Sequence, residues 1–312
     1  MARRFDLVAY LKLVRFPLVF TAIADSAAGY CVGTSNKLEF SGTLALLALA
    51  SGCLYLFGMA LNDIADLEKD REAAPGKVLP SGRVSRIGAI AIAWILLGVS
   101  LAAICWIPAT PLLNRLLLWG CVVLAILAYD LHWIKMPPIM GFVRACNLLL
   151  GVVAVVTIRF DSGLDGAHPW KCAALAAPLF IYGTSLTYVS TLEDAALDRR
   201  KLMIGAVGMS IGALLAATVV PLILILTHGH RHTGQLVLSL AAAWILVAWI
   251  VRRARRANDR KGLMLMVRDG VAGYILVDAA IVLSEGPPLK GLLVASLLAP
   301  AILSLYIFKK LV

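Results

Sequence analysis

Ten long apolar runs divide this sequence, and they limit what it can fold into more than any other feature. Each is close to the roughly 20 residues that an α-helix needs to cross a lipid bilayer. Glycine, proline and charged residues mark most of the joins between them. The runs cover residues 13–34, 43–61, 88–107, 113–131, 138–158, 172–190, 203–227, 234–251, 266–284 and 289–308.

The composition agrees with this pattern, because 61% of the residues are hydrophobic and only 15% are charged. Water-soluble globular domains do not combine these proportions with apolar runs of such length. We therefore predict an all-α membrane protein. A single polytopic domain, residues 1–312, should form a bundle of nine to ten transmembrane helices around a central cavity.

The distribution of basic residues predicts the orientation. The net charge is +11, and in a membrane protein such an excess is first explained by the positive-inside rule rather than by nucleic-acid binding. Placing the N-terminus in the cytoplasm puts most lysines and arginines on that side, including Arg252–Arg256 and Lys309–Lys310. We expect an integral protein of a bacterial inner membrane, in contact with the bilayer and not with nucleic acid.

An acidic segment follows the second apolar run directly, at residues 62–72. Asn62, Asp66 and Asp70 are spaced four apart, which places them on one face of a continuing helix. With Asp63, they form a set of oxygen ligands of the kind that Mg2+ prefers together with substrate phosphates. The spacing favours a magnesium–diphosphate site at the membrane face. A solvated loop of mixed charge is the alternative, because Lys69 and Arg71 are interleaved.

A second acidic segment follows the sixth apolar run, and it repeats this spacing. Asp194 and Asp198 are again four residues apart, and Arg199, Arg200 and Lys201 come next. Both segments fall on the predicted cytoplasmic side, four helices apart. This relation predicts a parallel pseudo-repeat in which the loops 62–86 and 190–203 face one shared cavity.

The two segments resemble the paired motifs of the UbiA superfamily of intramembrane prenyltransferases. Asn62-Asp63-x-x-Asp66-x-x-x-Asp70 resembles the first motif, and Asp194-x-x-x-Asp198 the second. The turn 77–85 and the segment Tyr129–Lys135 are similar to two further family features. The resemblance covers roughly residues 10–285. Departures such as Thr191, Leu197 and Lys77 indicate a divergent branch, similar to the UbiA-like proteins of bacterial ebo-type clusters.

The resemblance implies a Mg2+-dependent transfer of an isoprenoid group from a polyprenyl diphosphate to an acceptor that the motifs do not specify. In that case Asn62, Asp63, Asp66, Asp70, Asp194 and Asp198 hold Mg2+. The phosphate oxygens are then held by basic side chains, and tyrosine faces steady the allylic cation. These substrate-binding candidates are Lys77, Arg83, Tyr129, Lys135, Arg144, Arg199 and Lys201.

Two other functions stay open at this point. A terpene cyclase of the same superfamily would ionise a prenyl diphosphate and close the cation on itself. A non-catalytic lipid carrier or transporter would place its charges near the middle of the membrane, and Asp25, midway along the first apolar run, keeps that alternative open. Most of the carboxylates lie instead at one face, which favours the transferase.

Overall fold

A computed structural model of the chain describes residues 6–34, 41–108, 110–157, 169–194, 198–228, 233–285 and 287–310. Every apolar run falls on a helix or on two consecutive helices, and the described residues contain no β-strand. The predicted all-α bundle is thereby confirmed. The long helices are α2 (Val19–Gly33), α3 (Gly42–Ala65), α5 (Arg86–Trp106), α6 (Leu112–Asp130), α7 (Pro137–Val153), α8 (Pro169–Ser190), α9 (Arg199–His228), α10 (Thr233–Arg256) and α11 (Arg260–Glu285).

The first apolar run does not form the single helix that its length predicts. The short helix α1 (Leu7–Leu13) ends before Arg15, whose φ of 48° and ψ of 45° place it in the left-handed region. A turn of 3-10 helix, η1 (Phe16–Leu18), then leads into α2. Pro17 disfavours helical geometry at the residue before it, so the chain changes direction here and Arg15 is displaced from the helix.

The last apolar run also divides, into α12 (Pro288–Ser296) and α13 (Leu298–Lys310). Pro300 lacks the N–H that would donate to Ser296 in a continuous helix, which explains a break at Leu297. Together they span 21 residues, Pro288–Phe308, with a mean hydropathy of 2.2. This pair is long and apolar enough to cross a bilayer.

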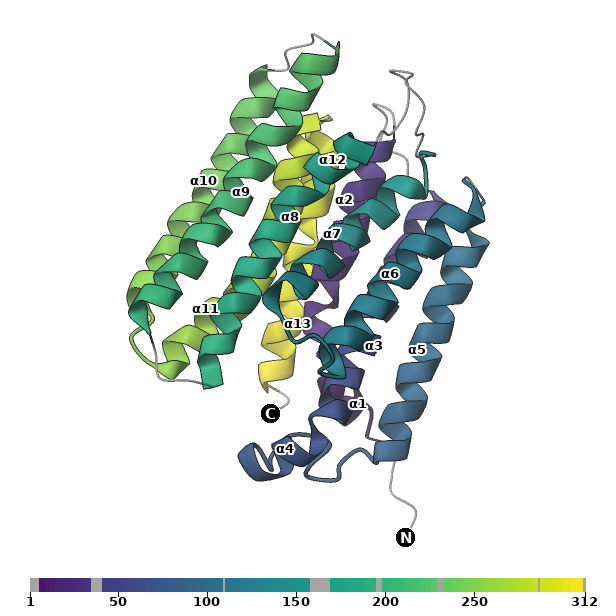
Figure 1. The fold of residues 1–312 in the computed structure, drawn as a ribbon, viewed down its shortest axis with the longest axis vertical. Helices are drawn as coiled ribbons and strands as arrows, with labels where there is room; N and C mark the ends of the chain where they lie inside the picture. Colours follow the sequence, from purple (N-terminus) through teal and green to yellow (C-terminus); the bar gives the residue numbers. More distant parts are fainter. Residues whose placement is uncertain are drawn as a thin grey trace.

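The helices run side by side in one bundle, with α5 and α10 at opposite edges (Figure 1). Eight helical segments of the described chain are long and apolar enough to cross a bilayer, and α7 is a shorter apolar helix. The protein is therefore an integral membrane protein. The short helix α4 (Leu67–Ala73), the α10–α11 connection and the end of α13 all lie at one end of the bundle.

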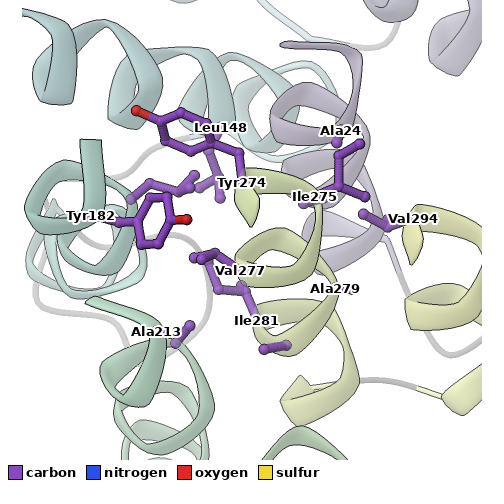
Figure 2. Packing of buried hydrophobic residues seen from close by; sticks show 14 of the residues in the cluster. Ala24, Leu148, Tyr182, Ala213, Tyr274, Ile275, Val277, Ala279, Ile281 and Val294 are labelled. Carbon is purple, nitrogen blue, oxygen red and sulfur yellow. The ribbon is translucent and has the colours of Figure 1, made fainter. Parts of the chain in front are cut away.

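Helix α11 passes through the centre of the bundle, which explains its low hydropathy. Its residues Tyr274, Ile275 and Val277 are buried among side chains of α2, α7, α8, α9 and α12 (Figure 2). Asp278, on the same helix, is fully buried. The polar groups of α11 consequently face protein rather than lipid, as ionisable groups within membranes generally do.

Helices α2 and α7 approach closely because glycines line their contact. A Cβ atom on Gly151 would overlap the backbone of Ser26 and Tyr30, and one on Gly29 would overlap the carbonyl of Leu148. Small residues allow the backbones of membrane helices to come together in this way. The contact places the side chains of α7 directly beside those of α2.

Candidate active site

A cavity of about 340 Å3 lies between α2, α3, α6, α7, α8 and α11. Its walls are mostly apolar, and polar side chains are found toward its two ends. The apolar lining includes Leu54, Met59, Val122, Ile126, Met140, Val143, Leu186, Val267 and Val271. The polar lining includes Arg15, Ser51, Asn62, Tyr129, Asp130, Lys135, Arg144, Asn147, Thr187 and Ser190. We call the end at Asn62, Asp130 and Lys135 the mouth.

The first acidic segment is bent at the mouth, because α3 ends at Ala65 and Asp66 separates it from α4. Leu67, the first residue of α4, is buried in a small cluster with Leu13 of α1 and with Leu79 and Val84 of the following turn. This packing turns α4 away from the axis of α3. The prediction that Asn62, Asp66 and Asp70 share one helical face is therefore wrong for Asp70.

Asn62 lies between two carboxylates at the mouth. Its amide Nδ2 is 3.5 Å from Oδ2 of Asp66 and 3.5 Å from Oδ1 of Asp130, which is the last residue of α6. Asp130 is buried with 5% of its surface exposed. The bend in the first segment and the end of α6 thus bring two acids from distant parts of the chain onto one amide.

A histidine and a lysine from the turn after α6 contact Asp66. Nε2 of His132 is 3.1 Å from Oδ1 of Asp66, and Nζ of Lys135 is 4.0 Å from the same atom. Lys135 also lies 2.9 Å from Nε2 of His132. His132 has a φ of 62° just past the helix end, the position where helices often adopt left-handed geometry. That turn directs both side chains toward Asp66.

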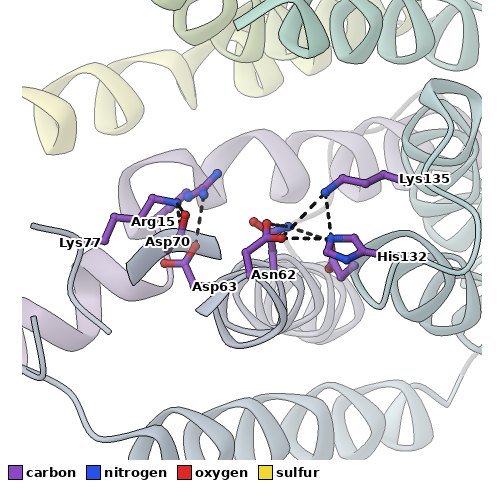
Figure 3. A network of polar contacts seen from close by, with 9 residues as sticks. Arg15, Asn62, Asp63, Asp70, Lys77, His132 and Lys135 are labelled. Carbon is purple, nitrogen blue, oxygen red and sulfur yellow. Dashed lines mark hydrogen bonds and ion pairs between the residues drawn. The ribbon is translucent and has the colours of Figure 1, made fainter. Parts of the chain in front are cut away.

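Asp63 and Asp70 form a separate group with two cations (Figure 3). Nζ of Lys77 donates to both carboxylate oxygens of Asp70, at 2.7 and 2.8 Å. Arg15 donates to Asp63 at 3.3 Å and also lines the cavity. The acidic segment therefore splits into two groups, Asn62 with Asp66 at the mouth and Asp63 with Asp70 beside it.

The basic turn after the first segment is tied to the N-terminal helix. Arg83 donates to Asp6 at 2.8 Å, and Asp6 also caps α1 by accepting from the N–H of Ala9. The hydrogen bond from Arg83 is the largest cause of a pKa of Asp6 below its ordinary value. Neither Lys77 nor Arg83 lines the cavity.

The second acidic segment does not continue as a helix from α8. Residues Thr191–Asp194 form a 3-10 turn, η2, and the side chain of Asp194 lies outside the described part of the chain. Asp198 caps α9 by accepting from the N–H groups of Arg200 and Lys201, at 2.9 and 3.2 Å. Residues 195–197 also lie outside the described part of the chain, so the shared helical face of Asp194 and Asp198 stays a prediction.

Two cations of the second segment have contacts away from the cavity lining. Arg199 donates to the carbonyl of Arg255 at 3.1 Å and to Oδ1 of Asn258 at 2.8 Å, so that it holds the end of α10. Lys201 lies 3.8 Å from Asp198 on the surface. Ser190, at the end of α8, is the part of this region that reaches the cavity.

A buried polar group forms the inner end of the cavity. Arg144 pairs with Asp25 at 3.2 Å and lies over the ring of Tyr274, 3.7 Å from its centroid. Asn147 donates to Asp25 at 3.1 Å and contacts Ser51 at 2.7 Å. The sequence predicted that Arg144 binds phosphate, and its side chain does line the cavity. It lies about seven residues, or roughly 10 Å along the helix, beyond the start of α7.

Three residues at the mouth are absent from the sequence-based predictions: Arg15, Asp130 and His132. Asp130 and His132 lie within the Tyr129–Lys135 segment that the sequence singles out. The position of an acidic residue at the end of an apolar run could have identified Asp130 as a candidate. Arg15 stands two residues before Pro17, and only the left-handed turn there reveals its direction. Tyr129 and Lys135 line the cavity as predicted for substrate contacts.

The sequence is similar to a known protein family and to proteins of known name. A family model described as the UbiA prenyltransferase family matches residues 19–268. Digeranylgeranylglyceryl phosphate synthase of Saccharolobus solfataricus is 28% identical over 194 residues, 61% of this chain. That match spans 64% of the synthase, just under two thirds of its length. The same synthase of Korarchaeum cryptofilum is 27% identical over 243 residues, covering 75% of this chain and 80% of its own.

Solved structures share the fold at low sequence identity. A UbiA homolog from Archaeoglobus fulgidus bound to GPP and Mg2+ aligns with a TM-score of 0.60 and 15% identity, covering 92% of this chain and 99% of that one. A UbiA homolog from Aeropyrum pernix K1 aligns with a TM-score of 0.57 and 18% identity, covering 86% and 97%. These structures share the helical architecture that surrounds the cavity.

Proposed function

We propose that this chain, which belongs to the UbiA prenyltransferase family, is a Mg2+-dependent prenyltransferase acting on a polyprenyl diphosphate within the membrane. The observation that carries the proposal is one cavity with a charged mouth and apolar walls. A prenyl diphosphate has the matching form, since a multiply charged head is joined to a hydrocarbon tail. The tail would lie along the apolar walls and the diphosphate at the mouth.

The comparisons support the class of donor. Solved structures of the Archaeoglobus fulgidus homolog hold GPP or DMAPP together with Mg2+, and the curated relatives are named as digeranylgeranylglyceryl phosphate synthases. We infer that the donor for this chain is a prenyl diphosphate and that the acceptor is a nucleophile that enters the same cavity. The membrane location of the cavity favours a lipid-soluble product.

The residues at the mouth fit a magnesium ion bound together with diphosphate. Asn62 and Asp66 supply the oxygen ligands that a hard cation prefers, and substrate phosphates commonly complete such a site. The described residues contain no group of three or more His, Cys, Asp or Glu side chains poised to hold a metal on their own. This is consistent with a site that the diphosphate completes. When bound, Mg2+ would neutralise charge on the departing diphosphate.

Asp63, Asp70, Asp194 and Asp198 stay proposed ligands at this mouth. Asp70 would have to exchange its two contacts with Lys77 for the metal, which would release the Lys77 ammonium toward phosphate oxygens. Asp198 would bring its carboxylate from the end of α9 while that carboxylate also caps the helix. These exchanges keep the total charge constant, because each cation leaves a carboxylate for a phosphate.

The reaction needs the allylic C–O bond to break with its electron pair leaving on the diphosphate. Arg15 and Lys135 line the mouth and would bind phosphate oxygens, where their charge stabilises the leaving group more than the substrate. The apolar walls would exclude water that would otherwise capture the allylic carbon. The nucleophilic atom of the acceptor then bonds to that carbon and loses its proton to solvent at the mouth.

We further propose that the mouth faces the cytoplasm, with the N-terminus on the same side. The end of α10 and the start of α11 are rich in basic residues, and these elements lie with α4 at one end of the bundle (Figure 1). Cytoplasmic loops of membrane proteins carry this excess. The charged donor would then enter from the side on which soluble diphosphates are available.

The proposal is tested with the purified full chain in lipid nanodiscs, supplied with GPP, Mg2+ and a lipid extract of the expression host. We expect release of inorganic diphosphate and prenylated products by mass spectrometry, both requiring Mg2+ and the extract. Asp66→Asn should abolish release, whereas Asp259→Asn, at an exposed helix cap away from the cavity, should not. Diphosphate release without any extract, with a cyclic hydrocarbon as product, would contradict transfer to an acceptor.

A further inference from the structure

Asp130 is a buried acid at the mouth whose position no structural role explains. It closes α6, lines the cavity and has 5% of its surface exposed. Within the described part of the chain its side chain has one hydrogen bond, the 3.5 Å contact with Nδ2 of Asn62. Arg15 and Lys135 line the same cavity, but no ion pair to Asp130 is found among the described residues, and a buried charge that is not paired costs on the order of several kcal/mol. Such a residue is retained when a ligand supplies the missing charge.

The geometry of Asn62 indicates what that ligand is. Nδ2 of Asn62 is 3.5 Å from a carboxylate oxygen of Asp66 and 3.5 Å from one of Asp130, so the amide lies between the two carboxylates. Two carboxylates on either side of one amide repel each other unless a cation or a proton lies between them. A half-turn of the Asn62 amide exchanges Nδ2 for Oδ1, and all three side chains then present oxygen to the same point.

We propose that Asp130 is a ligand of the magnesium ion at the mouth, so that the first site is formed by Asn62, Asp66 and Asp130. This inference rests on the proposed function and adds a ligand from outside both acidic segments. It shifts the first metal site from a ladder on one helix to a site built between α3 and α6. Asp70, held by Lys77, would then belong to a neighbouring position on the diphosphate.

The inference also explains why His132 and Lys135, in the turn after α6, lie beside Asp66. Asp130 is fixed by α6, while His132 and Lys135 follow within the same turn and contact Asp66 from the other side. Residues that hold a metal-binding carboxylate in place commonly tune metal affinity. The segment Tyr129–Lys135 would thus deliver a ligand, a positioning histidine and a phosphate-binding lysine to one end of the cavity.

The test measures Mn2+ binding, which replaces Mg2+ at oxygen sites and is visible by electron paramagnetic resonance. The full chain in detergent is titrated with Mn2+ in the presence of inorganic pyrophosphate. We expect Asp130→Asn and Asp66→Asn each to weaken Mn2+ binding at least tenfold, and Asp259→Asn to leave it unchanged. Without metal, Asp130→Asn should unfold at or above the temperature of the wild type, because it removes a buried carboxylate, and Asp66→Asn should stay close to the wild type.

A second variant separates ligation from a structural effect. Asp130→Cys replaces oxygen by thiolate, so the site should lose preference for Mn2+ and gain Cd2+, seen as a cadmium–thiolate absorption band absent from the wild type. Wild-type Mn2+ binding in Asp130→Asn, or no cadmium band in a folded Asp130→Cys, overturns the role of Asp130 alone. Failure of the wild type to bind Mn2+ with pyrophosphate overturns the proposed function as well.

Discussion

Arg144 of α7 and Asp25 of α2 form an ion pair at 3.2 Å in the interior of the bundle, beneath the cavity. Asp278 of α11 adjoins the carboxyl group of Asp25, so two acids share one arginine. Two adjacent carboxylates repel each other, and the guanidinium of Arg144 offsets this repulsion at Asp25. The sequence marked Asp25 as an acid in mid-membrane; the structure gives it this partner.

Removing the arginine alone should be strongly destabilising. Arg144→Gln leaves Asp25 without its cation, and breaking a buried pair from one side costs about 3–5 kcal/mol. The double variant Asp25→Asn with Arg144→Gln removes both charges and should recover most of that loss. Thermal unfolding in one detergent measures both, and equal destabilisation by the single and the double variant would contradict the pairing.

The α2–α7 contact should not tolerate a methyl group. Gly151→Ala places a Cβ against the backbone of α2, so the helices must separate and the Arg144–Asp25 pair must lengthen. We expect a clear fall in unfolding temperature. Gly120→Ala is the matched control, because nothing lies within 4 Å of its added Cβ, and alanine in a helix is favoured by roughly 0.5–1 kcal/mol. A Gly151→Ala protein as stable as the control would contradict this packing.

Lys290 should act as a structural cap. Its ammonium donates to the carbonyls of Cys31 and Thr34 at 2.9 and 3.2 Å, which lie at the C-terminal end of α2. Hydrogen bonds from charged groups contribute about 1.5–3 kcal/mol, so Lys290→Met should lower stability by that order. Leu292→Ala on the same helix, at a side chain 60% exposed, should have little effect. The two variants are compared by thermal unfolding.

One substitution at Asp198 should separate its role as the cap of α9 from its proposed role as a metal ligand. Its side chain caps α9, and asparagine caps a helix about as well as aspartate. Asp198→Asn should therefore keep the unfolding temperature but reduce diphosphate release, because the metal requires the negative charge. Asp198→Ala should lose activity and also about 1 kcal/mol of stability. Full activity in Asp198→Asn would remove this residue from the site.

The Arg83–Asp6 ion pair, which links the N-terminal helix to the basic turn, should weaken as the pH falls. Arg83 holds the pKa of Asp6 below its ordinary value, so the charged carboxylate stabilises the fold near neutral pH. That stabilisation is lost as the pH falls through the lowered pKa, because the protonated acid no longer accepts from Arg83. The protection of residues 7–13 against hydrogen exchange, taken relative to the intrinsic exchange rate at each pH, should fall with acidification. In Arg83→Gln the protection should already be lower near neutral pH and should change less on acidification.

The local sequence was sufficient to predict the helices and the two acidic segments. Hydropathy is a property of each stretch of about 20 residues, so the apolar runs that became helices could be recognised without knowing their neighbours. The motif spacing also indicated the mouth, and Asn62, Asp66, Tyr129 and Lys135 are found there. The single helical face was wrong for Asp70, because the packing of Leu67 interrupts the first segment.

Only the tertiary structure decided which charges meet. Asn62 and Asp130 are 68 residues apart, and Arg15 and Asp63 are 48 apart. Such contacts depend on the order in which helices pack and on a left-handed turn at Arg15, and no periodicity in the sequence records either. The sequence by itself determined that this chain forms apolar helices fit to cross a membrane and carries acidic segments at their ends. The packing of α3 against α6 decided which of these polar side chains lie together, because charge pairing acts through space and not along the chain.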